Sequence, residues 1–199
     1  MVDLIILGTD IHVLEVIDIV RMTGKFNFIG MIRNSSDGPS SFMGYPVLGG
    51  PDALTQYPDA LSAPLHVWKE RGERTNWVSI IAPSSFISSS AVLGVGCIIY
   101  PNCFIGANAQ LGDGIFMLSG SVINHDCVIE DNVTITTGVT LAGSVRVKTG
   151  AYLGQACTVK QLLTVGENCL VGMGAVVTRD VPDGKTVKGC PARVWPLYK

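Results

Sequence analysis

Every sixth residue from Ile81 to Val177 is Ile, Leu, Val or Met, without a break. A period of six matches neither the repeat of a helix, close to 3.6, nor the heptad repeat of a coiled coil. It is typical of very short strands separated by corners and stacked as a solenoid. We therefore expect a solenoid over about 79–182. The unbroken spacing also predicts that no loop is inserted between its coils.

A second set of mostly small residues follows the same repeat, four positions after the large ones. Residues two apart on a strand face the same way, so we expect this second set to point inward. Five of the six cysteines occupy it: Cys97, Cys103, Cys127, Cys157 and Cys169. Cysteine in such a place is a small apolar filler. The chain has no CxxC and no Cys/His pair with ligand spacing, so we expect no metal.

The segment 1–78 follows other periods. Leu4–Leu7 and Phe28–Ile32 read as buried strands, and the apolar positions from Val13 to Val20 predict a helix that ends near Gly24. Strand, helix and strand at this spacing indicate a βαβ unit with a parallel sheet. Ser35–Gly50 is rich in Ser, Gly and Pro and is expected to be loop. The sequence thus divides into a small α/β domain (1–78), the solenoid (79–182) and a C-terminal tail (183–199).

Composition adds a charge asymmetry to this picture. The segment 1–145 carries six Lys or Arg against thirteen Asp or Glu, whereas the segment 146–199 carries eight against three. A basic end on an acidic chain favours either an anionic partner or simply a solvated face. No apolar run is long enough to cross a membrane, and the N-terminus lacks the basic start of a signal peptide. We expect a cytoplasmic protein with neither membrane insertion nor a nucleic-acid partner.

Two C-terminal segments, Val171–Pro182 and Gly189–Arg193, resemble the closing signature of the hexapeptide-repeat acyltransferases. This resemblance implies an N-terminal α/β, Rossmann-like subdomain followed by a left-handed parallel β-helix with three hexads per coil, hence five to six coils. It also implies a homotrimer that binds acetyl-CoA in grooves between neighbouring copies. Basic side chains near the C-terminus would then meet the phosphates of the cofactor.

A second motif, Val122–Ile129, contains His125 and Asp126. With the βαβ unit and Tyr45–Gly49, it resembles the subfamily that acetylates bacterial sugars, either nucleotide-linked amino sugars or sialic acid-like sugars, in glycan or surface polysaccharide biosynthesis. The resemblance implies that His125 is the general base and that Asp126 raises its basicity.

The chemistry agrees with this assignment. Acetyl transfer from a thioester needs a base for the attacking group and a donor for the oxyanion, and an imidazole suits the first task near neutral pH. His125 falls between two inward-facing positions, so we expect it at a corner, projecting outward. Gly143 lies three hexads, or one coil, later, and the resemblance implies a backbone amide there. Further cofactor-binding positions implied by the resemblance are Thr134, Gln155, Met173, Gly174 and Arg193.

The resemblance also suggests where the acceptor binds, although the chain departs from the pattern there. Relatives carry a glycine-rich turn after the first strand, but here Gly8 is followed by Asp10 and His12. The second strand of relatives often ends in an acidic pair, replaced here by Arg33 and Asn34. We take these five residues as acceptor-site candidates and His66 as structural.

These observations together predict an acetyl-CoA-dependent sugar acetyltransferase with direct transfer and no metal. An acetyltransferase for another acceptor, such as an amino acid, stays open, as does a non-catalytic trimeric β-helix protein. A carbonic anhydrase of the same architecture would need several histidines around zinc, and the solenoid contains one.

Overall fold

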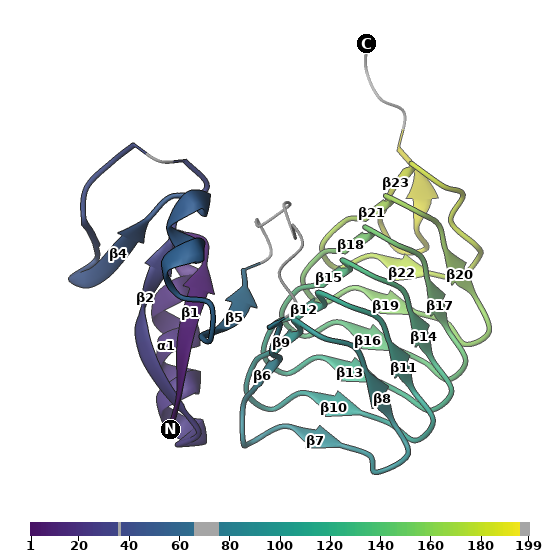
Figure 1. Cartoon of the computed structure of the whole chain (residues 1–199). Helices are drawn as coiled ribbons and strands as arrows, with labels where there is room; N and C mark the ends of the chain where they lie inside the picture. Colours follow the sequence, from purple (N-terminus) through teal and green to yellow (C-terminus); the bar gives the residue numbers. More distant parts are fainter. Residues whose placement is uncertain (36, 66–75, 196–199) are drawn as a thin grey trace.

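The computed structural model describes residues 1–35, 37–65 and 76–195, and most of these belong to a stack of very short parallel strands (Figure 1). His66 lies outside the described residues. A typical strand of the stack pairs with the strands three hexads before and after it, as β10 (Phe104–Ile105) does with β7 (Phe86–Ile87) and β13 (Val122–Ile123). The stack therefore has three flat faces, which we call the first, second and third face. This parallel β-helix is the solenoid that the period of six predicts.

The first face contains β6 (Ile80–Ile81), β9 (Ile98–Ile99), β12 (Phe116–Met117), β15 (Thr134–Ile135), β18 (Tyr152–Leu153), β21 (Leu170–Val171), β23 (Thr186–Lys188) and β24 (Arg193–Val194). The second face contains β7, β10 and β13 together with β16 (Thr140–Leu141), β19 (Thr158–Val159) and β22 (Val176–Val177). The third face contains β8 (Val92–Leu93), β11 (Gln110–Leu111), β14 (Val128–Ile129), β17 (Arg146–Val147) and β20 (Thr164–Val165).

The interior of the solenoid is a single apolar column. The large residues of the repeat are buried from Ile99 onward, and the slot four positions later is buried beside them except at Leu163, which is partly buried. All five solenoid cysteines are buried, which confirms the inward orientation expected for them. Burial raises the pKa of the Cys157 thiol to about 12. These thiols are packing groups rather than nucleophiles.

The corners between strands share one backbone conformation. In each corner from 96 to 174, the third residue after the large apolar position has a left-handed φ between 52° and 71°. Gly, Asn and Asp tolerate this region best, which explains why they recur there. The residues of this slot are Gly96, Asn102, Asn108, Gly114, Gly120, Asp126, Asn132, Gly138, Ser144, Gly150, Ala156, Leu162, Asn168 and Gly174.

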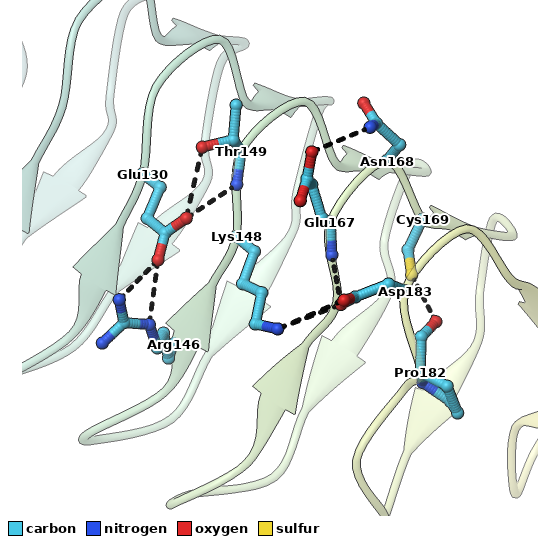
Figure 2. A network of polar contacts seen from close by, with 9 residues as sticks. All are labelled: Glu130, Arg146, Lys148, Thr149, Glu167, Asn168, Cys169, Pro182 and Asp183. Atoms are coloured by element: carbon cyan, nitrogen blue, oxygen red, sulfur yellow. Dashed lines mark hydrogen bonds and ion pairs between the residues drawn. The ribbon is translucent and has the colours of Figure 1, made fainter.

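Carboxylate side chains accept hydrogen bonds at the corners that follow the third face (Figure 2). Glu130 accepts hydrogen bonds from the backbone N–H of Thr149 (3.1 Å) and from Nε of Arg146 (2.9 Å). Near the C-terminal end, Asp183 accepts one from the Glu167 N–H (2.9 Å) and one from Lys148 Nζ (3.0 Å). These contacts hold the pKa of both carboxyls below the usual value. The acidic side chains here satisfy corner amides of neighbouring coils.

The N-terminal segment forms a separate five-stranded sheet with the order β3-β4-β2-β1-β5. Its elements are β1 (Val2–Leu7), α1 (His12–Thr23), β2 (Phe26–Ile32), β3 (Ser41–Phe42), β4 (Tyr45–Gly49), the 3-10 helix η1 (Pro51–Gln56) and β5 (Leu61–Pro64). The strand–helix–strand order matches the prediction, and α1 ends at Gly24 with a left-handed φ of 63°.

Two expectations from the sequence differ from the structure. The composition of Ser35–Gly50 predicts a loop, but this segment contains β3 and the strand β4, which pairs in parallel with β2. Its Ser, Gly and Pro content hides the short apolar stretch Tyr45–Gly49. In the expected tail, β23 adds another parallel strand to β21, and β24 returns antiparallel to β23. The tail therefore extends the first face of the solenoid instead of leaving it.

The helix α1 packs against the first face of the solenoid, where it contacts β6. One apolar cluster joins Val13 and Val16 of the helix to Ile98, Tyr100 and Phe116 of the first coils. Both parts therefore share a core, so the orientation of the N-terminal sheet relative to the coils is set by packing.

Candidate active site

His125 occupies the corner between β13 and β14, as its place in the repeat predicts. Its side chain is 65% exposed and points outward from the solenoid. The Ser144 N–H donates to the backbone carbonyl of His125 (2.9 Å), which ties this corner to the next coil. The imidazole thus lies on a corner whose backbone is hydrogen-bonded to the next coil, and it faces solvent.

Asp126 pairs with this imidazole although the two residues are adjacent in the chain. Adjacent residues on a flat strand point in opposite directions, but Asp126 has a left-handed φ of 58°. The turn brings its Oδ2 to 2.8 Å from His125 Nδ1. Hydrogen bonds from His125 and then from Asn108 hold the pKa of the Asp126 carboxyl below its usual value. An ionised carboxylate only accepts, so Nδ1 donates to it and Nε2 is left as the basic nitrogen.

Gly143 lies one coil beyond His125 on the same corner. A Cβ on Gly143 would lie 2.6 Å from both Cε1 and Nε2 of the imidazole, so only glycine leaves room for the ring. Among the described residues none accepts the Gly143 N–H, although its carbonyl accepts from Leu162 N (3.2 Å). The Gly143 backbone therefore lies beside the edge of the ring that carries Nε2.

The predicted cofactor positions do not all lie on this corner. Gln155, Met173 and Gly174 belong to a different corner column, in which the Gly174 N–H donates to the Gln155 carbonyl (2.8 Å). Met173 is 77% exposed there. Thr134 begins β15 on the first face. Within one chain the solenoid therefore separates these positions from His125.

Arg193 lies at the C-terminal end of the solenoid. It lines a cavity of about 180 Å³ together with Arg179 and Asp180. Arg179 lies on the corner after β22, three coils beyond the corner that carries His125. The His125 corner column therefore leads toward a basic cavity.

The structure divides the five acceptor candidates into two groups. Arg33 and Asn34 line a cavity of about 330 Å³ with Thr9 and Phe42, at the carboxyl ends of β1 and β2. Arg33 is buried and donates to the carbonyl of Pro39. Ligands of open parallel sheets bind at such strand ends. Gly8, with a φ of 123°, follows β1 at the same edge, and its N–H donates to the backbone carbonyl that ends β2 (2.8 Å).

Asp10 and His12 lie at the start of α1, where His12 also contacts the solenoid. Asp10 Oδ1 accepts the N–H of His12 (2.8 Å) at the start of α1. The His12 ring packs edge-on against Phe116, with ring centroids 5.4 Å apart, and its Nδ1 lies 3.3 Å from Glu15 Oε2. Neither residue lines the cavity at the strand ends.

Sequence reasoning missed two residues that adjoin the pair of His125 and Asp126. Asn108 donates from Nδ2 to Asp126 Oδ1 (3.0 Å). Gly106 lies under the His125 backbone, where a Cβ would come within 2.8 Å of the His125 nitrogen. Spacing is the signal that could have found Asn108, because it precedes Asp126 by one coil.

Over the described residues, no group of three or more His, Cys, Asp or Glu is arranged to hold a metal ion. None of the described helices has the length and apolar character needed to cross a membrane.

Solved structures match the chain over nearly its whole length. A histidine-to-alanine mutant of GDP-perosamine N-acetyltransferase from Caulobacter crescentus, in complex with CoA and GDP-perosamine, superposes with a TM-score of 0.89 at 26% identity and covers 98% of this chain and 97% of that chain. WeeI from Acinetobacter baumannii gives a TM-score of 0.83 at 26% identity, with coverage of 98% and 100%. The chain resembles the hexapeptide-repeat acyltransferases from end to end.

Further matches support this resemblance. The acetyltransferase domain of PglB from Neisseria gonorrhoeae, solved with acetyl coenzyme A, shares the fold with a TM-score of 0.87 at 24% identity and covers 97% of this chain and 98% of that chain. Serine acetyltransferase of Bacillus subtilis is 36% identical over 116 residues, covering 54% of this chain and 52% of its own length. The chain thus spans about half the length of this curated relative. No family model matches the chain.

Proposed function

We propose that this protein is an acetyl-CoA-dependent acetyltransferase that acts on a sugar, with His125 as its general base. The observation that carries the proposal is the corner at His125, where the Asp126 carboxylate lies 2.8 Å from His125 Nδ1 and the Gly143 backbone lies beside the ring edge that carries Nε2. A base and an oxyanion donor on one rigid element are the parts that acyl transfer needs.

The reaction is a direct transfer. Nε2 of His125 takes the proton as the acceptor nitrogen or oxygen attacks the thioester carbonyl carbon. The Gly143 N–H donates to the oxyanion that forms. Collapse of this intermediate breaks the C–S bond, and the imidazolium returns the proton to the departing thiolate. Asp126 stabilises the imidazolium between these two steps.

We infer that acetyl-CoA lies between neighbouring copies of a homotrimer. Thr134, Gln155, Met173 and Gly174 lie apart from His125 within one chain, so a second copy must bring such positions to the base. The basic cavity at Arg193 would take the phosphates of the cofactor.

We place the acceptor in the cavity at the carboxyl ends of β1 and β2. Its polar lining suits the carrier group of a nucleotide-linked sugar, and the structural neighbour that binds GDP-perosamine supports this class. The match to serine acetyltransferase favours a second candidate, an amino-acid acceptor. We place the reaction in the cytoplasm.

An acceptor panel tests the proposal. The full chain is incubated with acetyl-CoA and GDP-linked amino sugars, UDP-linked amino sugars, a free sialic-type sugar or serine, and free CoA and acetylated product are measured. We expect turnover with a nucleotide-linked amino sugar, abolished in His125→Ala and retained in Ser89→Ala, an exposed residue two coils earlier on the same corner. Turnover with serine alone would favour the second candidate. No turnover and no binding of acetyl-CoA would refute the transferase assignment.

A further inference from the structure

The carboxylate of Asp126 is held at both of its oxygens. Oδ2 lies 2.8 Å from His125 Nδ1, and Oδ1 accepts a hydrogen bond from Asn108 Nδ2 at 3.0 Å. Asp126 is half-exposed, so the peptide turn alone leaves its side chain free to rotate toward water. The second contact, which comes from the preceding coil, restricts that rotation.

The backbone of Asn108 is itself held by a hydrogen bond to the preceding coil. Its backbone has a left-handed φ of 59°, and its N–H donates to Ser90 Oγ at 3.0 Å. Ser90 Oγ lies 3.2 Å from Ser88 Oγ. The hydrogen bonds therefore run along the solenoid edge from Ser90 through Asn108 to Asp126 and end at the imidazole. Because the backbone of Asn108 is anchored, its side chain is a defined donor for Asp126.

We propose that Asn108 is a positioning residue of the active site, which orients the Asp126 carboxylate so that His125 keeps its proton on Nδ1 and presents Nε2 to the acceptor. The proposal rests on the proposed function for its effect on turnover. The effect of Asn108 on structure concerns only the tautomer of the His125 imidazole.

Asn102 provides a control that distinguishes the positioning role of Asn108 from the backbone conformation of its corner. It has a φ of 61°, and its N–H donates to Ser84 Oγ at 3.3 Å, so its backbone matches that of Asn108. The residue one coil after Asn102 is Gly120, whereas the residue one coil after Asn108 is Asp126. Asparagine at 102 thus has the corner conformation without a carboxylate above it.

The test compares Asn108→Gly with Asn102→Gly. Glycine accepts a positive φ at no steric cost, so both variants are expected to fold. The protein is labelled with ¹⁵N-histidine, and the chain has three histidines, so His125→Ala assigns the resonance. Above the pH at which imidazole titrates, we expect His125 to carry its proton on Nδ1 in the unchanged protein and in Asn102→Gly. Asn108→Gly should show an increased fraction of the Nε2–H form.

Turnover gives the second readout. In Asn108→Gly we expect kcat to fall roughly tenfold, less than the 10²-fold that a misplacement of about 1 Å can cost, with KM for acetyl-CoA unchanged. Asn108→Asp keeps a residue suited to the corner but replaces the donor with an acceptor, so it should lose at least as much.

The outcomes separate the two proposals. An unchanged tautomer and an unchanged kcat in Asn108→Gly would overturn the role of Asn108 even if the protein is an active transferase. A changed tautomer in a protein without any transferase activity would support the positioning role and refute the proposed function. Equal effects in Asn102→Gly would assign the loss to the corner conformation and also overturn the positioning role.

Discussion

At the scale of residues, the site depends on the small space around one imidazole. Gly143 leaves room for the ring on one side, and Gly106 leaves room for the His125 backbone on the other. The sequence predicted His125 at a corner and Gly143 one coil later from spacing alone. The pairing of His125 with Asp126 came from the resemblance and not from spacing, because adjacent residues make this contact only through the left-handed φ of Asp126.

Gly143→Ala tests how tightly the imidazole is enclosed. The new Cβ would overlap Nε2 and Cε1, so we expect the ring to move and kcat to fall by about 10²-fold. Steady-state kinetics measure the change. Gly120→Ala is the control, because it adds a methyl group where no heavy atom lies within 4 Å, and Ala156 shows that alanine fits this corner slot. A Gly143→Ala enzyme with unchanged kcat would contradict the observed placement of the ring.

Asp126→Asn tests the charge beside the base. Asparagine keeps the corner conformation but removes the negative charge that stabilises the imidazolium. The pKa of Asp126 is lowered by His125 and Asn108, so the carboxylate stays ionised throughout the range in which an imidazole titrates. We therefore expect kcat to fall by roughly 10²-fold and the acid limb of the pH–rate profile to move to lower pH. A limb that stays in place would show that Asp126 does not act on the base.

At the scale of elements, the period of six predicted the strands and the inward cysteines because it reports a purely local alternation. The boundaries were less accurate where tertiary pairing decides. Tyr45–Gly49 forms a strand because it can pair with the free edge of β2. Thr186–Lys188 forms a strand because it can pair with the edge of β21. Neither edge is visible in the composition of the segment itself.

Thiol reactivity tests the interior of the solenoid. Five of the six cysteines are buried and Cys190 is exposed. Since the reactive species is the thiolate, the raised pKa of a buried thiol such as Cys157 slows its reaction further. We expect a thiol-specific disulfide reagent at mildly alkaline pH to modify one thiol per native chain and all six after denaturation. Rapid modification of Cys127 in the native protein would contradict the inward orientation of this slot.

At the scale of the whole molecule, the N-terminal sheet and the solenoid share an apolar cluster at α1. The sequence predicted both parts but not their contact, and it assigned His12 and Asp10 to the acceptor. In the structure His12 packs on Phe116, and Asp10 accepts the first amide of α1. The His12 ring helps to dock the sheet against the first face, and neither side chain lines the cavity at the strand ends.

Phe116→Ala tests this docking. Phe116 is 3% exposed, and truncation of a buried phenylalanine costs about 3 kcal/mol in the free energy of unfolding. We expect a lower melting temperature by calorimetry and, because the acceptor cavity moves relative to His125, a raised KM for the acceptor with little change for acetyl-CoA. Leu170→Ala, on the same face but 43% exposed, is the matched control and should be nearly neutral. Equal effects of the two substitutions would contradict the shared core.

The central claim is that His125 is the base of an acetyl transfer. The most direct measurement is kcat of the unchanged protein and of His125→Ala under saturating acetyl-CoA and the best acceptor, with acetyl-CoA binding measured by calorimetry for both. The account predicts that the variant binds acetyl-CoA with similar affinity and loses about 10²- to 10⁴-fold in kcat, the contribution of a positioned base. Transfer by His125→Ala at the rate of the unchanged protein would contradict it.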